Sequence, residues 1–184
     1  MNIEALEKSK IFKLYAKITG DAMESRFRHW LFDPVKTLQG ADIQLGQTVL
    51  EVGCGSGFFT VPAAQLIGHQ GSLVAMDVSS EYVERVSKKV QAANLRNVRV
   101  VKGDALDTGL DAESMDAVLL FGVIPFPMLP LNRLLPEMHR VLNPEGVLAV
   151  WLFPISFGVP KSILRSGLFE YSCKRNGVYN YRRC

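Results

Sequence analysis

Residues 49–57 read Val-Leu-Glu-Val-Gly-Cys-Gly-Ser-Gly, an apolar run that leads into three glycines at alternate positions. The part before Gly53 is typical of a short strand, and residues 58–68, FFTVPAAQLIG, have the composition of a helix that Gly68 ends. Glycines between a strand and a helix permit a tight turn and let a ligand approach the backbone closely. The N–H groups of the helix N-terminus face the same place. This stretch therefore predicts a ligand-binding turn at the edge of a sheet.

Strand-like and helix-like segments alternate after this turn. Alternation of this kind predicts a parallel sheet with helices on both faces, an α/β fold. A turn is predicted over 143–146, Asn-Pro-Glu-Gly, and Pro136 is expected to distort a helix or to begin it. The further strands are expected at 72–78, 97–105, 114–123 and 147–153, and the further helices at 79–95 and 131–142.

The C-terminal segment has a different pattern. Residues 168–175 and 178–183 are both strand-like, and Asn176-Gly177 lies between them. Asn-Gly between two such runs is a strong signal for a hairpin, because both positions of the tight turn need a positive φ. The sheet is therefore predicted to end in an antiparallel pair.

The first forty residues are expected to be helical. Apolar residues recur at helical spacing up to Gly20, and an aromatic-rich stretch precedes Pro34, which permits a further helical turn over 35–40. We therefore expect one domain over 1–184. It consists of an N-terminal helical cap over 1–40, a core over 45–153, and a terminal helix and antiparallel hairpin over 154–184.

Composition narrows the class of protein. The chain has 184 residues, of which 48% are hydrophobic and 21% charged, enough for one folded domain with a full core. The net charge of +3 does not by itself argue for a nucleic-acid or membrane partner. Cys54, Cys173 and Cys184 lack the spacing of a disulfide framework or a zinc site. With no signal peptide and no membrane span expected, these features predict a cytoplasmic protein without a metal.

Glu51 separates two kinds of ligand. A dinucleotide fingerprint, GxGxxG, read from Gly53 requires glycine at 58, where this chain has Phe58. A carboxylate two residues before the first glycine would repel a pyrophosphate, whereas it suits a cation such as an ammonium or a sulfonium. A nicotinamide-dependent oxidoreductase is therefore disfavoured.

Two further acids follow the next two predicted strands. Asp77 lies twenty residues after Gly57, where an acid can accept hydrogen bonds from both ribose hydroxyls, and Val78 can pack on adenine. Asp77 can instead cap the following helix; the two roles are compatible, because Ser79 or Ser80 can also cap it. Asp104, followed by the small Ala105, suits an adenine amino group.

These motifs, VLEVGCGSG, the Asp77 strand, VKGDA, MDAVLLF and LLPEMHRVLNPEGVLAVW, occur in order at normal separations. Over residues 45–153 the chain resembles class I S-adenosylmethionine-dependent methyltransferases. It is most similar to the branch that contains the ubiquinone/menaquinone-biosynthesis and type 11 enzymes. The resemblance implies a Rossmann-like, seven-stranded, mostly parallel sheet of order 3-2-1-4-5-7-6 with strand 7 antiparallel, and S-adenosylmethionine as the cofactor.

The resemblance also assigns residues to the cofactor. It places Asp77 on the ribose hydroxyls, Val78 beside adenine, and Asp104 and Ala105 at the adenine edge. The methionine end would be lined by Glu51, Gly53 and Gly55, and Phe121 with Gly122 would lie beside the sulfonium or the ribose.

The expected methyl acceptor is a small, hydrophobic or aromatic molecule. Residues 121–127, FGVIPFP, lack the [DN]PP[YF] motif of enzymes that methylate amino groups, and they contain no cysteine of the kind a cytosine-C5 enzyme needs. Their apolar side chains favour an apolar acceptor. In-line methyl transfer is expected, nucleic acid is not expected as a partner, and no catalytic base is assigned.

The N-terminal cap supplies the candidates for acceptor contact. Family members commonly fold such a segment over the cofactor, which implies Tyr15, Arg26 and His29 as substrate-contacting residues. Three alternatives stay open: a non-catalytic S-adenosylmethionine-binding module, an aminopropyl transferase, and an RNA methyltransferase that uses the basic tail. That tail, 154–184, contains six Lys or Arg and one Glu.

Overall fold

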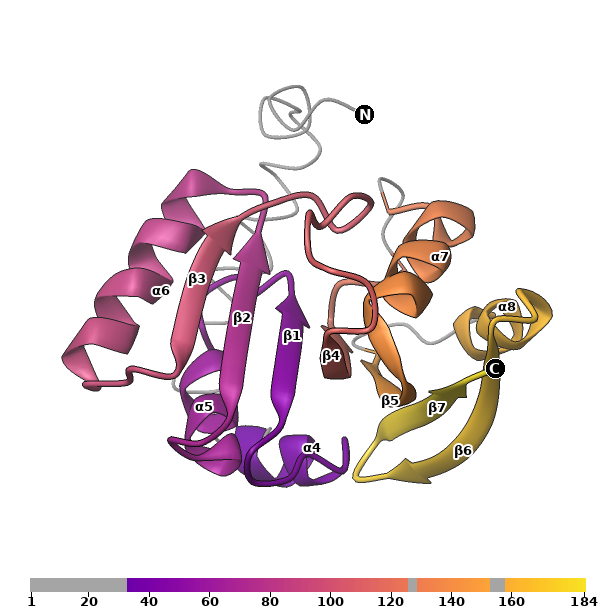
Figure 1. Cartoon of the computed structure of the whole chain (residues 1–184), viewed down its shortest axis with the longest axis horizontal. Coiled ribbons are helices and arrows are strands. Elements are labelled where there is room, and N and C mark those ends of the chain that lie inside the picture. Colours follow the sequence, from indigo (N-terminus) through magenta and orange to yellow (C-terminus); the bar gives the residue numbers. More distant parts are fainter. Residues whose placement is uncertain (1–32, 126–128, 153–157) are drawn as a thin grey trace.

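The computed structural model describes residues 33–125, 129–152 and 158–184 (Figure 1). The predicted contacts of Tyr15, Arg26 and His29 lie outside these residues. The helices are α4 (Pro34–Gln39), α5 (Thr60–Ile67), α6 (Ser80–Ala92), α7 (Leu131–Val141) and α8 (Val159–Arg165). The strands are β1 (Thr48–Val52), β2 (Ser72–Asp77), β3 (Val98–Lys102), β4 (Met115–Phe121), β5 (Leu142–Trp151), β6 (Phe169–Arg175) and β7 (Val178–Arg183).

The sheet has the predicted topology. Its seven strands lie in the order β3-β2-β1-β4-β5-β7-β6, and β7 runs antiparallel to both of its neighbours. The strands β1 to β5 pair in parallel. The chain winds outward in both directions from β1 and β4, so a crevice for ligands is expected at their carboxyl ends. The α/β fold class is confirmed.

Strand alternation divides the core between two faces of the sheet. Along β4, Val118 and Leu120 pack in one cluster with the apolar sides of α7 and α8. Leu119 and Phe121 point to the opposite face, where α4 and α5 pack. All four side chains are buried, which explains why this strand reads as an unbroken apolar run. A smaller cluster joins Val86 and Val90 of α6 to the sheet.

The turn predicted over 143–146 is wrong, because these residues lie inside β5. The pairing passes from Met115 with Leu142 to Ala117 with Val147, which leaves a bulge in β5. Side chains hold this bulge in place: Asn143 donates to Asp116, at 2.6 Å. Arg183 donates to the Leu142 carbonyl and Arg182 to the Glu145 carbonyl.

Pro136 lies within α7 and does not begin it. A proline inside a helix removes the hydrogen bond to the carbonyl four residues earlier, here that of Asn132. Both residues are exposed, so water can satisfy that carbonyl.

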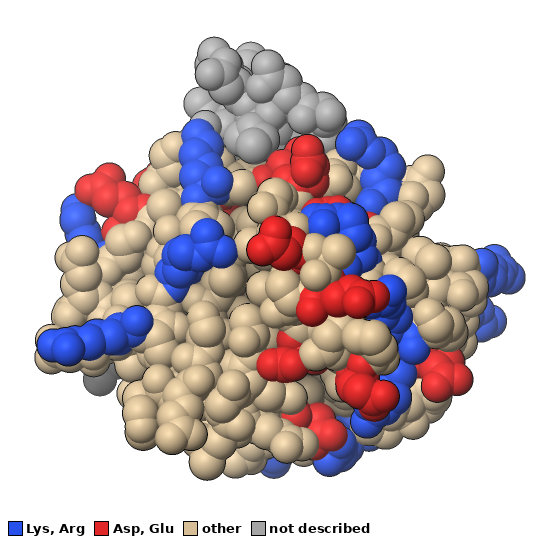
Figure 2. Space-filling model, in the orientation of Figure 1, with Lys and Arg blue, Asp and Glu red and all other residues tan. Residues whose placement is uncertain are grey.

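The predicted hairpin is confirmed. Asn176 and Gly177 have φ values of 47° and 82°, and they join β6 to β7 as a tight turn. Two basic side chains of this tail form ion pairs with other parts of the chain. Arg175 pairs with Asp42 at 3.0 Å, and Arg183 pairs with Glu113 at 2.9 Å. On the face shown in Figure 2, basic and acidic side chains are interspersed.

None of the helices in the described ranges is long and apolar enough to cross a membrane.

Candidate functional site

The glycine turn after β1 has a backbone that other residues cannot easily adopt. Gly53, Gly55 and Gly57 have φ values of 69°, 50° and 79°. A side chain at Gly53 would overlap Cγ1 of Val123, and one at Gly57 would lie 3.2 Å from Cγ2 of Val86. The turn therefore lies directly against the segment after β4 on one side and against α6 on the other.

Hydrogen bonds fix this turn to the neighbouring elements. The N–H groups of Gly53 and Cys54 both donate to the carbonyl of Met76, at 2.8 and 3.0 Å. The Gly57 N–H donates to the Cys54 carbonyl at 2.8 Å. From α6, Nζ of Lys89 donates to the Ser56 carbonyl at 2.8 Å. The loop is thus held before any ligand arrives, which reduces the ordering cost of binding.

Asp77 joins the glycine turn to the start of α6. Its side chain is buried, its Oδ2 accepts the Gly55 N–H at 2.9 Å, and its Oδ1 accepts the Ser79 N–H at 2.9 Å. Ser79, one of the two serines offered as a cap, is the N-cap residue, but its side chain makes no capping hydrogen bond. An ionised carboxylate has about four lone-pair positions, so Asp77 can accept hydrogen bonds beyond those from the backbone.

Burial raises the pKa of Asp77, although backbone N–H groups of Ser79, Gly55 and Val78 act to lower it. These hydrogen bonds favour the ionised form. A carboxylate with backbone donors on both oxygens and unused lone pairs fits the two hydroxyls of a ribose.

Glu51 lies on β1 in the middle of the sheet, close enough to Asp77 for the charge of Asp77 to affect its pKa. Only 3% of its surface is exposed, and Oγ1 of Thr60 donates to its Oε2 at 2.7 Å. Burial, together with the charge of Asp77, raises the pKa of Glu51 to about 8 against the opposing hydrogen bond from Thr60. Glu51 therefore carries a full negative charge near neutral pH only when a cation is close enough to lower its pKa.

Thr60, the first residue of α5, was missed by the sequence reasoning. A threonine at a helix start is too common to signal such a contact.

Cys54 lies between the first two glycines of the turn. Burial, together with the nearby Glu51 and Asp77, raises the pKa of its thiol. Only a thiolate is an effective nucleophile, so the position does not suit covalent catalysis.

The loop after β3 brings the third predicted acid to the same edge. The Gly103 N–H donates to the Asp77 carbonyl at 3.0 Å, which places this loop beside the end of β2. Asp104 is half-buried, and its Oδ1 accepts the Leu106 N–H at 2.9 Å. Ala105 is buried and Val78 half-buried. The structure thus brings the glycine turn, Asp77 and Asp104 together at the carboxyl ends of three neighbouring strands.

The ring of Phe121 is packed in the core. It makes an edge-to-face contact with Phe59, with ring centroids 4.9 Å apart, and lies 6.4 Å from the ring of Trp151. No sequence signal indicates this packing, because β4 is apolar on both faces. At the end of β4 it is therefore the main chain of Phe121 and the adjoining Gly122 that can face a ligand.

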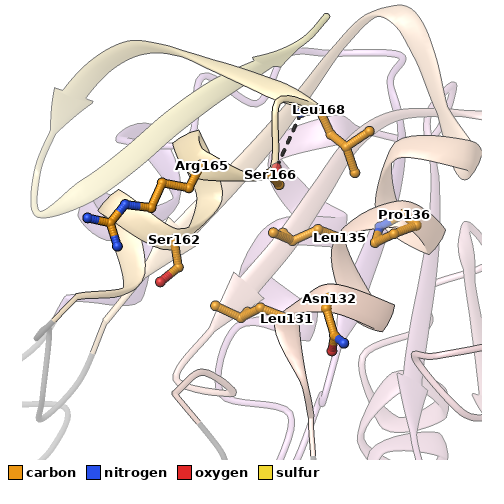
Figure 3. A pocket seen from close by; sticks show the side chains of 8 residues that line it. All are labelled: Leu131, Asn132, Leu135, Pro136, Ser162, Arg165, Ser166 and Leu168. Carbon is orange, nitrogen blue, oxygen red and sulfur yellow. Dashed lines mark hydrogen bonds between the residues drawn. The ribbon is translucent and has the colours of Figure 1, made fainter.

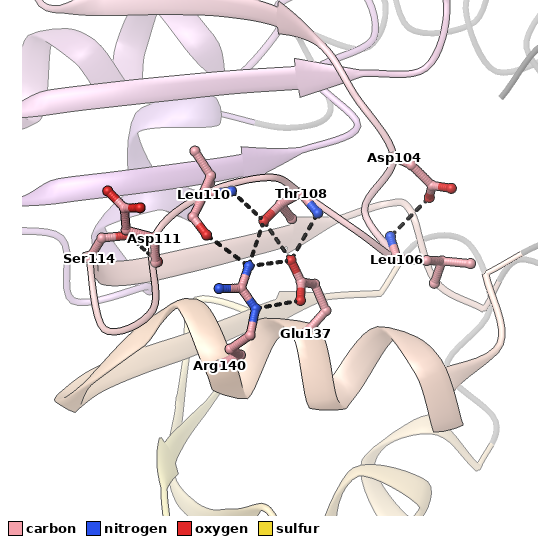
Figure 4. A network of polar contacts seen from close by, with 8 residues as sticks. All are labelled: Asp104, Leu106, Thr108, Leu110, Asp111, Ser114, Glu137 and Arg140. Atoms are coloured by element: carbon pink, nitrogen blue, oxygen red, sulfur yellow. Dashed lines mark hydrogen bonds and ion pairs between the residues drawn. The ribbon is translucent and has the colours of Figure 1, made fainter.

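A polar network clamps the loop after β3 onto α7 (Figure 4). Arg140 donates to both carboxylate oxygens of Glu137, each at 2.8 Å, and to the Leu110 carbonyl at 2.8 Å. The same carboxylate accepts the N–H and the hydroxyl of Thr108, at 2.8 and 2.6 Å. The hydrogen bonds from Arg140, with those from Thr108, hold the pKa of Glu137 down at about 2. The segment that carries Asp104 is fixed in this way.

We predict that Glu137→Gln lowers the free energy of unfolding at pH 7 by about 2–3 kcal/mol, because a charge-assisted hydrogen bond contributes about 1.5–3 kcal/mol. The pKa is lower in the folded protein, so the contribution is present above about pH 4.5 and is lost as the pH falls towards 2. Urea unfolding at pH 7 and at pH 3 measures both effects. Hydrogen exchange at the Thr108 and Leu110 amides is expected to accelerate.

Glu84→Gln is the matched control. Glu84 pairs with Lys88 at 2.6 Å, but both side chains are largely exposed, at 69% and 72%. An ion pair exposed to this extent is screened by water and contributes little to stability. Equal losses for Glu137→Gln and Glu84→Gln would contradict the assignment of the clamp.

Within the described ranges, no group of three or more His, Cys, Asp or Glu side chains is placed to hold a metal ion.

Comparison with known proteins agrees with this geometry. Residues 49–146 match the family model described as "Methyltransferase domain". The demethylmenaquinone methyltransferase of Shouchella clausii is 31% identical over 137 residues, which is 74% of this chain and 56% of the relative. The enzyme of the same name from Listeria welshimeri is 31% identical over 148 residues, 78% of this chain and 62% of the relative. The chain thus spans about 56–62% of the length of these curated relatives.

A solved structure shows the same fold. A protein described as a SAM-dependent methyltransferase from Aquifex aeolicus aligns with a TM-score of 0.73 at 24% identity, covering 90% of this chain and 96% of that one. At this identity the alignment shows the fold alone. The family match and the curated relatives, taken with the strand order and the glycine turn, show that this chain belongs to the class I S-adenosylmethionine-dependent methyltransferases of the ubiquinone/menaquinone type.

Proposed function

We propose that this chain binds S-adenosylmethionine at the carboxyl ends of β1, β2 and β3 and transfers its methyl group to a small apolar acceptor. The observation that carries the proposal is Asp77. Its carboxylate is buried at the end of β2 and bonded to the glycine turn, and it keeps lone pairs for a ribose. The cofactor is the one that membership of this family implies.

The remaining cofactor contacts are assigned by position. The turn at Gly53 and Gly55 lets the ligand approach the backbone, and Glu51 lies below the turn as the acid for a cationic methionine end. Beyond the ribose, the adenine would lie towards the loop after β3. Val78 would flank the ring, Asp104 and Ala105 would meet its edge, and the main chain of Phe121 and Gly122 would close the other side.

The chain contributes to the reaction by holding the two reactants in position. When bound, S-adenosylmethionine supplies a methyl carbon on a sulfonium, whose leaving group is a neutral thioether. A bond from the acceptor atom to this carbon forms as the carbon–sulfur bond breaks, and the acceptor loses one proton. The turn and Asp77 hold one reactant in line with the other, and the apolar segment after β4 excludes water. No residue is assigned as the general base.

An aromatic quinol is the acceptor class that we propose. Val123 and Ile124, which follow β4, are apolar, and Ile124 is buried. The curated relatives carry the name demethylmenaquinone methyltransferase. Tyr15, Arg26 and His29 stay predictions for acceptor contact, and a cytoplasmic location stays a prediction as well.

The test is transfer of the labelled methyl group from S-adenosylmethionine to a panel of a naphthohydroquinone, a small amine and total RNA. We expect label in the naphthohydroquinone. Label in RNA alone would contradict the acceptor class and favour a role for the basic tail. Calorimetric binding of S-adenosylhomocysteine without any transfer would contradict methyl transfer and identify a non-catalytic binding module.

A further inference from the structure

The last turn of α6 contacts the second half of the glycine turn. Nζ of Lys89 donates to the Ser56 carbonyl at 2.8 Å. The stem of Lys89 packs there as well, because a Cβ added at Gly57 would lie 3.7 Å from its Cδ. Cγ2 of Val86, one helical turn earlier, would lie 3.2 Å from the same Cβ. The C-terminal part of α6 therefore covers the turn and bonds to its main chain.

The beginning of α6 is bonded to the first half of the same turn through Asp77. Oδ1 of Asp77 accepts the N–H of Ser79, which is the N-cap residue of α6. Oδ2 accepts the N–H of Gly55. A carboxylate thus links one end of the helix to the turn, and the ammonium of Lys89 links the other end. Asp77, the glycine turn and α6 form a closed set of contacts.

The Lys89 contact differs from the ion pairs on the outer side of α6. Its acceptor is the main chain of Ser56, a residue that is only 2% exposed. A hydrogen bond from a charged donor is stronger than one between neutral groups. The adjacent Lys88 instead pairs with Glu84 of the same helix, and both of those side chains are largely exposed. Of the two neighbouring lysines, Lys89 is therefore the one that can influence the turn.

We propose that Lys89 is a positioning residue for the cofactor, whose ammonium holds the Ser56 carbonyl so that the turn keeps the conformation to which S-adenosylmethionine binds. The inference rests on the proposed function, because it takes the glycine turn to hold the cofactor. Glycines give the turn more conformational freedom than other residues would, so ordering it is costly. A contact that orders the turn beforehand improves affinity. Lys89 acts on the turn and not on the methyl group, so it should change affinity and leave the chemical step unchanged.

The test is Lys89→Met, which keeps the alkyl stem and removes the ammonium. We expect the KM for S-adenosylmethionine and the dissociation constant of S-adenosylhomocysteine to rise about tenfold, because a hydrogen bond from a charged donor is lost. The kcat should change less than twofold. Lys89→Arg, which restores a charged donor, should bring affinity to within threefold of the wild type. A loss in Lys89→Arg equal to that in Lys89→Met would overturn the role of the charge.

Lys88→Met is the matched control, because it removes the adjacent lysine from the same helix. Its partner is Glu84 and not the turn, so cofactor affinity should stay within twofold of the wild type. Urea unfolding gives the native fraction of each variant, and affinity is calculated for that fraction. A loss in Lys88→Met as large as in Lys89→Met would overturn the inference.

A remote control is available at the cavity between α7 and α8, which has a volume of about 420 Å³ (Figure 3). Leu131 and Leu135 from α7 face Ser162 from α8 across it. Ser162→Ala, at this distant cavity, should leave cofactor affinity unchanged, and a tenfold loss there would also overturn the inference. The lining of the cavity is Leu131, Asn132, Leu135, Pro136, Ser162, Arg165, Ser166 and Leu168.

Hydrogen exchange without any ligand separates failure of this inference from failure of the proposed function. The Gly57 N–H donates to the Cys54 carbonyl inside the turn, so its exchange reports how well the turn is held. We expect this amide to exchange at least fivefold faster in Lys89→Met and at the wild-type rate in Lys88→Met. Unchanged exchange in Lys89→Met would overturn the positioning role even if the wild type binds S-adenosylhomocysteine. A wild type that does not bind it would overturn the proposed function and this inference together.

Discussion

Asp77→Asn is expected to weaken the binding of S-adenosylhomocysteine at least a hundredfold. Asp77 accepts hydrogen bonds from the N–H groups of Gly55 and Ser79 and is proposed to accept two more from the ribose hydroxyls. The single side-chain oxygen of asparagine can accept only some of these. Each hydrogen bond to a charged acceptor contributes about 1.5–3 kcal/mol, and about 1.4 kcal/mol is a factor of ten in affinity. Calorimetric titration at pH 7.5 measures the loss.

A second ligand makes the test specific to the ribose. The 2′-deoxy analogue of S-adenosylhomocysteine lacks one hydroxyl, so the wild type should bind it at least tenfold more weakly. Asp77→Asn should bind both ligands equally. If the variant keeps the full discrimination, Asp77 does not hold the ribose.

Folding is controlled separately, because Asp77 also anchors Gly55. Urea unfolding shows which fraction of the variant is native, and affinity is calculated for that fraction. Glu81→Gln removes an exposed carboxylate from α6 and should change neither ligand's affinity more than twofold.

Glu51→Gln is expected to remove most of the pH dependence of stability between about pH 4.5 and pH 8. The pKa of Glu51 is about 8 in the folded protein against an ordinary 4.5, so between these values the folded state binds more protons than the unfolded state. Stability is therefore highest at or below about pH 4.5, as far as this group is concerned, and falls as the pH rises to about 8. The loss has an upper bound of roughly 5 kcal/mol, because a tenfold change in proton affinity corresponds to about 1.4 kcal/mol.

Urea unfolding from pH 5.5 to 9 checks this expectation. The wild type should lose stability across the range, and Glu51→Gln should follow a flatter curve and exceed the wild type at pH 9. Thr60→Val removes the hydrogen bond that favours the ionised form of Glu51, so it should steepen the loss. A flat curve for the wild type would contradict the burial of an ionisable Glu51.

The same carboxyl links cofactor binding to pH. A cationic methionine end favours the ionised form, so binding below about pH 8 should release a proton from Glu51. Calorimetry in buffers of different ionisation enthalpy measures this release. Glu51→Gln should abolish it, and an unchanged proton release in that variant would assign the proton to another group.

The glycine turn and the terminal hairpin were open to prediction because their signals are local, whereas the order of the strands was implied by the resemblance to a known family. Positive φ at Gly53, Gly55 and Gly57 is needed by the turn itself, and Asn176-Gly177 encodes its hairpin in two residues. The alternation of strands and helices predicts Asp77 at the end of the second strand, and its role towards a ribose stays a prediction.

The roles of Glu51 and Phe121 within the site could not be predicted from local signals. The sequence predicts an ionised carboxylate at Glu51. Its burial beside Thr60, which disfavours the ionised form, depends on how α5 packs on the sheet. The direction of the Phe121 ring depends on which face of β4 it occupies, and an apolar run on both faces contains no signal for that. The bulge at 143–146 is likewise held by Arg182 and Arg183, far along the chain.

The sequence by itself determined the class of fold and the acids that follow its strands, because periodicity and glycine positions express the backbone requirements of each segment. The order of the strands followed from the resemblance to a known family. Only the tertiary structure decided the burial of Glu51, the clamp of Glu137 and Arg140 on the loop after β3, and the cavity between α7 and α8. Each of these arises where segments distant in sequence pack together. Burial and cavity shape are properties of that packing, and no local pattern contains them.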